Sequence, residues 1–289
     1  MKVIRSEVIG YCKGVSRAIS IVYKAIKLGK ELDKKVYTLG NLIHNPQVVE
    51  KITLEGVKVI EESDATKVEP GIVVLRAHGV SDHVRRTFLE NGFYIFDATC
   101  PIVLKEQKLV EFAPQDSTIV VIGGKAHPEA LALKNVETPN EKVIISDKHD
   151  IINIPNTNNI FVVIQSTFPS GMSKEIVSSL ENFAQKNGVE IEFANELCNS
   201  NQRRRIAVAK LAKQCNCIIV IGGKNSSNTR GLYNYCVNQG VETYLISNKD
   251  EIPLEVFDYD VIGLATGTST PHFVIDEIED KLKRGKNET

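Results

Sequence analysis

The sequence predicts an α/β fold made of three similar lobes with mainly parallel sheets. The first observation behind this prediction is a repeat, since Cys12, Cys100 and Cys198 lie 88 and 98 residues apart and each follows a short strand-like run. The second is the alternation of apolar strand-like segments with helical segments, which is typical of parallel α/β units. The third is that these strand-like segments are rich in Val and Ile without polar alternation, as in strands covered by helices on both faces.

Two further apolar strands follow each cysteine, and both end in polar residues. The first set covers residues 36–45, 118–129 and 217–228, and the second set covers residues 71–81, 159–169 and 259–271. Their polar ends carry His44 and His78 in the first repeat, His127 and Thr167 in the second, and Ser226 and Ser269 in the third. Ligands bind beyond the carboxyl ends of strands in open parallel sheets, so these residues are candidates for one shared site. A period this long excludes a solenoid and indicates three units around a common axis.

Helical segments begin shortly after the cysteines. Apolar residues from Val15 to Ile26 recur at helical spacing, and Pro101 suits the first turn of a helix after the second cysteine. Residues 201–212 after the third cysteine are compatible with a helix, as are residues 173–187. Each thiol is therefore expected at a strand-to-helix junction, where the helix dipole favours the thiolate form that binds metal.

The repeats suggest where the lobes begin and end. We expect a first α/β lobe at 13–100, a second at 101–197 and a third at 198–283, with a solvated tail at 284–289. The third repeat lacks a strand after its last polar loop, so the N-terminal segment 1–12 is expected to complete that lobe.

Composition and charge narrow the class of protein. The chain has 289 residues, 25% of them charged, with a net charge of −1 and a pI of about 6.6. These values indicate neither a nucleic-acid-binding nor a membrane-binding surface. No apolar run reaches the roughly 18 residues that span a bilayer, and residues 1–14 lack the long apolar segment of a signal peptide. We therefore expect a cytoplasmic protein, in which cysteines serve metal binding or catalysis rather than disulfides.

The three repeated cysteines suit either zinc or an iron–sulfur cluster. Structural zinc sites usually contain a closely spaced cysteine pair, and no such pair occurs among these three. Three distant thiolates that meet on an axis fit a cluster with one iron not held by cysteine better than they fit zinc. Cys215, Cys217 and Cys236 are interpreted as small buried hydrophobes.

The polar strand ends form a set of hydrogen-bond donors suited to an anion, and phosphate is the anion that we expect. The set consists of His44, His78, His127, Thr167, Ser226, Ser227, Asn228 and Ser269. No nucleotide-binding motif of the GxxxxGK[ST] or GxGxxG type accompanies them. Glu129 is the one carboxylate in these loops, which suggests proton transfer. Residues 203–205, three consecutive arginines, are expected to form a solvated helix face or to dock an acidic electron donor.

These residues lie in motifs that resemble a known family. The segments are GYCKGV with Cys12, HNPQVV with His44, AHGVS with His78, DATCP with Cys100, HPE with His127 and Glu129, QST ending at Thr167, Cys198 itself, KNSSN ending at Asn228, and TGTSTP with Ser269. In this order, and over nearly the whole chain, they resemble the 4-hydroxy-3-methylbut-2-enyl diphosphate reductase family. Members of that family carry out the last step of the methylerythritol phosphate route of isoprenoid biosynthesis.

The resemblance implies a three-lobed oxidoreductase around a central 4Fe–4S iron–sulfur cluster, held by Cys12, Cys100 and Cys198, with one open iron for the substrate. The implied reaction is the reductive dehydration of (E)-4-hydroxy-3-methylbut-2-enyl diphosphate to isopentenyl diphosphate and dimethylallyl diphosphate. The diphosphate would be held by His44, His78, His127, Ser226, Ser227, Asn228 and Ser269. Glu129 would carry the protons, and Thr167 would bind the substrate hydroxyl and Glu129. Reduced ferredoxin or flavodoxin is the implied electron donor, because the sequence shows no motif for a flavin or a second cluster.

The chain departs from the family pattern in two places. Residues 199–201, Asn-Ser-Asn, replace the usual Ala-Thr, and Arg204-Arg205 stands where Arg-Gln is usual. Residues 130–132, Ala-Leu-Ala, replace the usual Val and Gly after HPE. Neither departure replaces a predicted ligand. The first is expected to affect contacts around the cluster, and the second to affect helix packing.

Two other interpretations stay open on the residues alone. A quinolinate-synthase-like enzyme also uses three cysteines, three pseudo-repeats and an open-iron cluster, for dehydration without net reduction, although HNPQVV, HPE and KNSSN argue against it. A non-catalytic iron–sulfur sensor or phosphate-binding module would make Glu129 and Thr167 dispensable.

Overall fold

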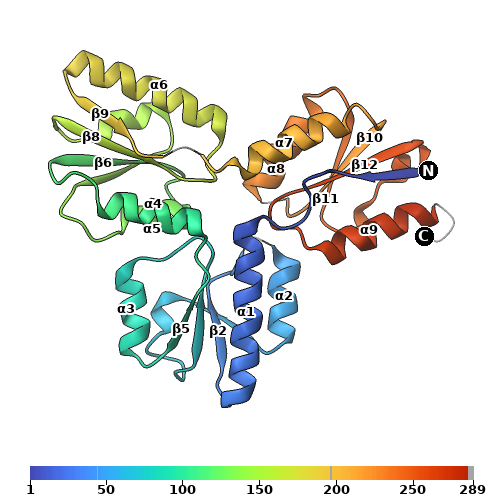
Figure 1. The fold of residues 1–289 in the computed structure, drawn as a ribbon, viewed down its shortest axis with the longest axis horizontal. Helices are drawn as coiled ribbons and strands as arrows, with labels where there is room; N and C mark the ends of the chain where they lie inside the picture. Colours follow the sequence, from blue (N-terminus) through green and yellow to red (C-terminus); the bar gives the residue numbers. More distant parts are fainter. Residues whose placement is uncertain (44, 196, 225, 286–289) are drawn as a thin grey trace. The chain divides into compact units, whose positions relative to one another are not determined.

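The computed structural model describes residues 1–43, 45–195, 197–224 and 226–285. The described strands form three four-stranded sheets, here called sheets A, B and C, in which every pair of neighbours is parallel (Figure 1). This arrangement confirms the predicted α/β class with three parallel-sheet lobes. Contacts divide the chain into two compact units: unit 1 is Met1–Ser16, Ile43–Ile52 and Asn199–Thr289, and unit 2 is Arg17–Leu42 and Thr53–Cys198. Unit 1 contains sheet A, and unit 2 contains sheets B and C.

Sheet B has the strand order β3-β2-β4-β5. Its strands are β2 (Val36–Leu39), β3 (Lys58–Ile60), β4 (Ile72–Leu75) and β5 (Tyr94–Asp97), and the helices of this part of the chain are α1 (Lys13–Leu32), α2 (Pro46–Leu54) and α3 (Asp82–Glu90). Val73 and Leu75 point into a core that includes Tyr37, Phe88 and Phe93. Phe93 contacts the other two rings edge-on, at centroid distances of 5.9 and 5.1 Å. Aromatic burial therefore fixes α3 against the sheet.

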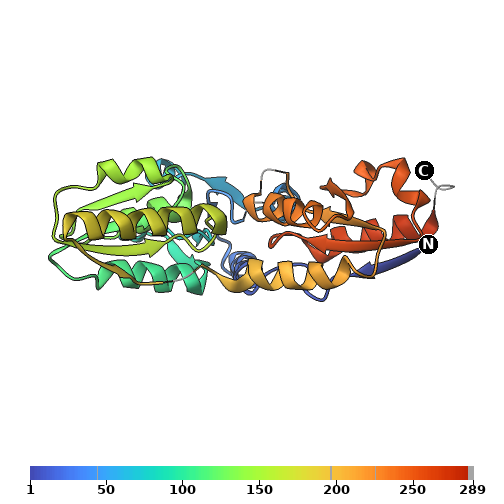
Figure 2. The same ribbon diagram turned by 90° about the horizontal axis from the view of Figure 1, so that it is seen from above.

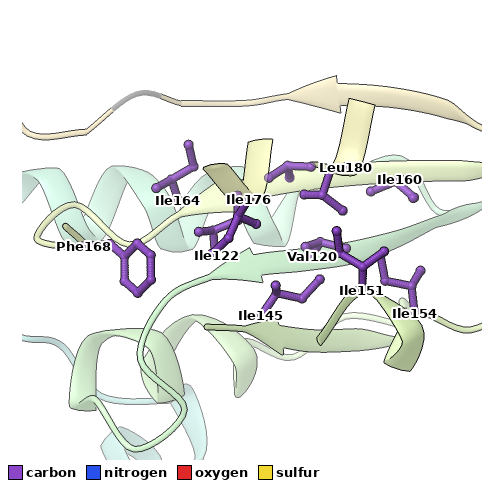
Figure 3. Packing of buried hydrophobic residues seen from close by; sticks show 11 residues of the cluster. Val120, Ile122, Ile145, Ile151, Ile154, Ile160, Ile164, Phe168, Ile176 and Leu180 are labelled. Carbon is purple, nitrogen blue, oxygen red and sulfur yellow. The ribbon is translucent and has the colours of Figure 1, made fainter. Parts of the chain in front are cut away.

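Sheet C has the order β7-β6-β8-β9 and is covered by helices on both faces. Its elements are α4 (Pro101–Glu111), β6 (Ser117–Ile122), α5 (Pro128–Lys134), β7 (Lys142–Ile145), β8 (Asn159–Ile164), α6 (Ser170–Asn187) and β9 (Glu190–Phe193). Figure 1 shows α6 along one side of the sheet and α4 and α5 along the other. Ile122 packs toward Ile176 and Leu180 of α6 (Figure 3), whereas Val121 packs with Leu133 of α5. Alternate residues of β6 thus enter two apolar cores, which explains why the strand shows no polar alternation.

Sheet A has the order β1-β12-β10-β11. Its elements are β1 (Lys2–Arg5), α7 (Asn199–Leu211), β10 (Cys217–Ile221), α8 (Ser227–Val237), β11 (Glu242–Ile246), β12 (Val261–Thr266) and α9 (His272–Arg284). Strand β1 lies beside β12 at the edge of the sheet, with Lys2 opposite Val261 (Figure 2). Ile219 packs in the core that contains α9 residues, and Val220 packs in the core shared with α7 and α8.

The three sheets share one topology. In each, the first strand along the repeat (β2, β6 or β10) lies between the second (β3, β7 or β11) and the third (β4, β8 or β12). The strand that precedes a repeated cysteine (β5, β9 or β1) forms an edge. From the first strand, the chain continues to one side of the sheet for the second strand and to the other side for the third, so a switch point lies between the first and third strands. Open parallel sheets bind ligands at such a switch point. The edge strands β3, β7 and β11 were not predicted. They are short, and charged residues such as Lys58, Lys142 and Glu242 obscure their apolar character.

Short 3₁₀ helices occupy some connections. They are η1 (Glu62–Asp64), η2 (Lys148–Asn153), η3 (Lys249–Glu251) and η4 (Leu254–Asp258). None of the described helices combines the length and apolar character that crossing a membrane requires.

Candidate active site

The predicted site residues lie beyond the carboxyl ends of the strands, in the two units. Unit 2 carries His78 after β4, Cys100 after β5, His127 and Glu129 after β6, Thr167 after β8 and Cys198 after β9. Unit 1 carries Cys12 after β1, Ser226 and Asn228 after β10, and Ser269 after β12. His44 and the side chain of Ser227 lie outside the described part of the chain.

The three repeated cysteines occupy equivalent places in the three lobes. Each is half-buried and directly precedes a helix: Cys12 precedes α1, Cys100 precedes α4 and Cys198 precedes α7. Cys100 is the N-cap of α4, with Pro101 at the first helical position, as the sequence predicted. Cys12 Sγ accepts a hydrogen bond from Val15 N in the first turn of α1, at 3.5 Å. Backbone N–H groups at a helix N-terminus stabilise a thiolate, which is the form that binds iron.

One backbone hydrogen bond recurs at each cysteine and ties it to a polar loop. Cys100 N donates to Ala77 O at 2.9 Å, Cys198 N donates to Ser166 O at 3.2 Å, and Cys12 N donates to Thr268 O at 2.9 Å. Ala77, Ser166 and Thr268 immediately precede His78, Thr167 and Ser269, which are the predicted polar residues after the third strand of each sheet. Each lobe therefore holds a thiol and a polar side chain on adjoining loops.

The remaining cysteines have a different environment. Cys217 and Cys236 are fully buried, and burial raises the pKa of each thiol to about 12. Cys215 is half-buried, and burial also raises the pKa of its thiol. These three stay protonated at neutral pH, which fits packing rather than metal binding. Within either unit, the described residues bring together no group of three or more His, Cys, Asp or Glu side chains that could hold a metal ion. The three-cysteine ligand set thus stays a prediction.

Glu129 lies at the centre of a buried hydrogen-bond network in unit 2. Its side chain, in the first turn of α5, belongs to a residue that is 1% exposed. Oε1 accepts from both N and Oγ of Ser166 at 2.6 Å, and Oε2 accepts from Thr167 Oγ1 at 3.1 Å. Burial raises the pKa of Glu129, and these donors oppose the rise. The loop after β8 therefore holds the carboxyl in one orientation.

Thr167 is held by Gln165 as well as by Glu129. Gln165 Nε2 donates to Thr167 Oγ1 at 2.7 Å, and Gln165 Oε1 accepts from Gly124 N at 2.9 Å, so the backbone fixes the orientation of the amide. One lone pair of the Thr167 hydroxyl therefore accepts from Gln165. The single hydrogen of this hydroxyl can be donated to ionised Glu129 or to another acceptor. When Glu129 is protonated, it can donate to the second lone pair and release the hydroxyl hydrogen for a substrate oxygen. Thr167 can therefore pass on a proton from Glu129 without moving.

Two predicted histidines contact each other beside this network. The rings of His78 and His127 lie 5.8 Å apart between centroids, with their planes at 84°. His127 Nδ1 accepts from Glu129 N at 3.2 Å. Because Nδ1 is an acceptor, Nε2 carries the hydrogen of the neutral ring. That nitrogen is a donor suited to the oxygen of an anionic group.

Unit 1 gathers its polar residues at the start of α8. Ser226 is the N-cap of this 11-residue helix, and its Oγ accepts from Thr229 N at 3.4 Å. Asn228 Nδ2 donates to Thr268 Oγ1 at 2.9 Å, which joins the helix to the loop that carries Ser269. A Cβ at Gly267 would lie 2.2 Å from Thr229 Oγ1, so this close approach requires glycine. A helix N-terminus surrounded by hydroxyl and amide groups is suited to a phosphate.

Two asparagines contribute to this part of the site, and the sequence did not assign them a role. Asn45 Nδ2 donates to Ser269 O at 3.0 Å, and Asn45 Oδ1 accepts from Val48 N at 3.1 Å. An Asn followed by Pro46 at the start of a helical pattern is a recognisable cap signal, which could have identified it. Asn201 Nδ2 donates to Asn228 Oδ1 at 2.6 Å. The departure at residues 199–201 therefore touches a predicted substrate-binding residue.

The expectation of a solvated arginine face is wrong for Arg204. This residue is only 3% exposed. Its guanidinium donates to Gly10 O at 2.6 Å, to Val8 O at 3.3 Å, and to O and Oγ1 of Thr266 at 3.2 and 3.0 Å. Burial lowers the pKa of Arg204, and the nearby Cys12 opposes that shift. Arg204 thus clamps the segment that leads to the first cysteine.

Helical periodicity would have revealed this role. Arg204 shares one face of α7 with the buried Ala207, Val208 and Leu211, at the spacing of an apolar stripe. The run of three consecutive arginines concealed the pattern, because only the middle one lies on that face.

We expect Arg204→Lys to lower the free energy of unfolding by about 2 kcal/mol, because one ammonium group cannot reproduce the four hydrogen bonds of the guanidinium. Arg203→Lys, on the exposed side of the same helix, is the control and should change it by less than about 0.5 kcal/mol. Urea unfolding of both variants under reducing conditions measures the difference. Equal stability of the two variants would contradict the stabilising role of the Arg204 hydrogen bonds.

Comparison with known proteins decides the family. A sequence model described as LytB protein matches residues 3–283. The chain belongs to the LytB protein family. Family membership implies an iron–sulfur cluster, and it supports neither the quinolinate-synthase-like enzyme nor the sensor.

Two reductases match this chain over nearly their full length. The chain is 36% identical to the 4-hydroxy-3-methylbut-2-enyl diphosphate reductase of Caldanaerobacter subterraneus subsp. tengcongensis, over 100% of this chain and 99% of that protein. It is 33% identical to the reductase of the same name from Treponema denticola, over 99% of this chain and 100% of that protein.

Two solved structures share the fold. The E-1-hydroxy-2-methyl-but-2-enyl-4-diphosphate reductase from Plasmodium falciparum superimposes with a TM-score of 0.82 at 27% identity, covering 96% of this chain and 87% of that one. A second structure is described as (E)-4-hydroxy-3-methyl-but-2-enyl diphosphate reductase, the terminal enzyme of the non-mevalonate pathway. It superimposes with a TM-score of 0.76 at 29% identity, covering 98% of this chain and 100% of that one.

Proposed function

We propose that this LytB-family chain catalyses the reductive dehydration of (E)-4-hydroxy-3-methylbut-2-enyl diphosphate to isopentenyl diphosphate and dimethylallyl diphosphate. The observation that carries the proposal is the full-length relationship to reductases of that name. The buried Glu129 network supports it, because a reaction that releases water from an alcohol requires a positioned proton donor.

For the cofactor, we propose a 4Fe–4S cluster held by Cys12, Cys100 and Cys198. The donor set fits such a group, since each thiol is half-buried and stands at the start of a helix, whereas Cys217 and Cys236 belong to the packed core and Cys215 packs against it. When bound, the cluster would supply electrons singly and a Lewis-acidic iron to the reacting carbon–oxygen bond. Arg204 would support this site by fixing the backbone before Cys12 and by placing a positive charge near it.

For the diphosphate, we propose binding by His78, His127, Ser226, Asn228 and Ser269, which the sequence motifs identify. His44 and Ser227 complete the proposed set on the strength of the sequence motifs. His127 Nε2 and the backbone N–H groups at the start of α8 are donors, which is the chemistry that phosphate oxygens require.

For the protons, we propose that Glu129 acts on the substrate hydroxyl through Thr167. The hydroxyl of Thr167 would bind the substrate oxygen while it accepts a hydrogen from Glu129, in the geometry that Gln165 maintains. Reduced ferredoxin or flavodoxin is the proposed electron donor, in a cytoplasmic setting.

The test of the function is the anaerobic oxidation of a reduced viologen dye by cluster-loaded protein, with and without the hydroxymethylbutenyl diphosphate. We expect oxidation that depends on this substrate and releases both five-carbon diphosphates. A preparation with a full iron complement that fails to consume reductant would exclude the reductase function.

Thr167→Val removes the hydroxyl and keeps the side-chain shape. We expect kcat to fall by about 10- to 100-fold with little change in KM, because the proton path is lost while the diphosphate contacts remain. Thr87→Val is the control, since Thr87 lies on α3 and, among the described residues, its hydroxyl donates to His83 O, away from the Glu129 network. Steady-state viologen kinetics measures both variants, and wild-type kcat in Thr167→Val would refute the relay.

A further inference from the structure

A second buried carboxyl group, Glu106, lies behind Glu129 in unit 2. Glu106 stands on α4 and Glu129 on α5, and each residue is 1% exposed. Among the described residues, the main groups that act on Glu106 are the Glu129 carboxyl, the amide of Asn195 and the backbone of Ser166. None of these groups is a cation, so two adjacent buried anions would repel each other without compensation. One of the two acids must therefore hold a proton.

The distribution of donors decides which acid holds it. Glu129 accepts three hydrogen bonds, two at Oε1 and one at Oε2, which are the partners that a carboxylate requires. Among the described residues, Glu106 accepts one within 3.5 Å, from Asn195 Nδ2 to Oε1 at 3.3 Å, and the backbone of Ser166 acts on it more weakly. Glu106 Oε2 is buried, and no donor from the described residues reaches it. The ionised form is thus stabilised at Glu129 and the neutral form at Glu106.

The orientation of Asn195 confirms which oxygen of Glu106 must accept. Asn195 Oδ1 accepts from Ile164 N at 2.7 Å, and Asn195 Nδ2 donates to Ile164 O at 2.8 Å. These two backbone bonds fix the amide, so the group facing Glu106 is an N–H donor. Oε1 is therefore the acceptor, and Oε2 is the position left for the proton.

Electrostatics agrees with this geometry. Burial and the neighbouring Glu129 charge raise the pKa of Glu106 to about 9, and a hydrogen bond between the two acids contributes in the same direction. The same hydrogen bond lowers the pKa of Glu129, against the effect of burial. At neutral pH Glu106 therefore keeps its proton, and the three donors at Glu129 favour the negative charge of the pair at that carboxyl.

We propose that Glu106 is a buried carboxylic acid that stores the proton which Glu129 delivers to the substrate. The role rests on the proposed reductase function. In the transfer, the O–H bond of Glu106 breaks and an O–H bond forms on the Glu129 carboxylate. Glu129 gives a hydrogen to the Thr167 hydroxyl, and Thr167 gives its own hydrogen to the leaving oxygen of the substrate. Glu106 is left as a carboxylate and regains a proton from solvent. No electron moves in these steps, because the external donor supplies the electrons for the reduction.

The matched variants are Glu106→Gln and Glu111→Gln. Gln at position 106 keeps the size of the side chain, can accept from Asn195 and can donate to Glu129, but it cannot release a proton. Glu111 lies on the same helix and is exposed, so its variant controls for substitution in α4. A role of Glu106 limited to packing or hydrogen bonding would survive in Glu106→Gln.

The first readout is infrared spectroscopy of the cluster-loaded chain, which needs no substrate. At pH 7 we expect the carbonyl band of a protonated buried carboxylic acid in the wild type and in Glu111→Gln, and its absence in Glu106→Gln. The band should disappear as the pH is raised through about 9. A wild-type spectrum at pH 7 that matches Glu106→Gln would overturn the proposal.

The second readout is the pH dependence of turnover. We expect the kcat of Glu106→Gln to be about tenfold lower than that of the wild type, with KM unchanged. In the wild type, deprotonation of Glu106 should make kcat fall at alkaline pH, and this fall should be absent in Glu106→Gln. Wild-type kcat with an unchanged pH profile in Glu106→Gln would overturn the role in proton delivery. If the wild type itself shows no turnover, the reductase function and the delivery to substrate both fail. The infrared band then still decides whether Glu106 holds the proton.

Discussion

Glu129→Gln is expected to lower kcat by about 10²–10⁴-fold, the range for loss of a positioned general acid, while iron content and KM stay near the wild-type values. The amide has the same shape as the carboxyl, so its Oε1 can still accept from Ser166 N and Oγ. It cannot give up a proton at neutral pH. The amide nitrogen would also face the Thr167 hydroxyl, which then has to accept rather than donate.

Viologen kinetics and iron analysis on one preparation test this expectation. Glu141→Gln is the control, because Glu141 is exposed beside β7 and takes no part in the network. A Glu129→Gln protein with wild-type kcat would refute the role of Glu129 in proton transfer. A protein that has lost its iron would instead show that Glu129 maintains the structure around Cys198, since Ser166 bonds both groups.

The same variant connects the two buried acids. Because the Glu129 charge raises the pKa of Glu106, its removal should lower that pKa. The carboxylic acid band of Glu106 should then disappear at a lower pH in Glu129→Gln than in the wild type. A pair of carboxyls that titrate independently would show no such shift.

The fold was predictable because its strongest determinants are local and repeated. The apolar strands β4, β6, β8 and β10 are continuous in the sequence, and each of the three repeated cysteines marks a strand-to-helix junction. The edge strands β3, β7 and β11 carry fewer apolar residues, since one side of each is not paired within its sheet. Their pairing depends on neighbours far along the chain, which periodicity does not reveal.

The site was predictable only where a residue type implied its chemistry. The sequence motifs singled out Glu129 and Thr167, and the structure places them in one hydrogen-bond network. Glu106 belongs to no motif, and on a helix a lone glutamate indicates a solvated position. Only the packing of α4 and α5 against the loop after β8 reveals that it is buried beside a second acid. The role of Arg204 was hidden for a similar reason, because its partners are backbone carbonyls of distant segments.

Cys100→Ser is expected to abolish cluster binding without harming the fold. A serine hydroxyl stays protonated at neutral pH and is a poor ligand for iron–sulfur clusters, which are held by thiolates. Helix α4 should keep its stability, because Cys100 is the N-cap of this helix and its side chain makes no capping hydrogen bond to the described backbone. Serine is among the preferred N-cap residues, so the iron-free variant should be as stable as the iron-free wild type, or more stable by about 0.5–1 kcal/mol. Loss of iron together with retained or increased stability would show that Cys100 is a cluster ligand and is not needed for folding.

Iron and sulfide analysis after anaerobic reconstitution, combined with urea unfolding of the iron-free proteins, measures both quantities. Cys215→Ser is the matched control: Cys215 is also half-buried, and its thiol bonds Leu211 O, a contact that a hydroxyl can reproduce. We expect this control to keep the wild-type iron content. A Cys100→Ser protein that retains the full iron content would exclude Cys100 from the ligand set. A variant with less iron and a clear loss of stability would instead assign Cys100 to the fold, because the capping argument predicts the opposite sign.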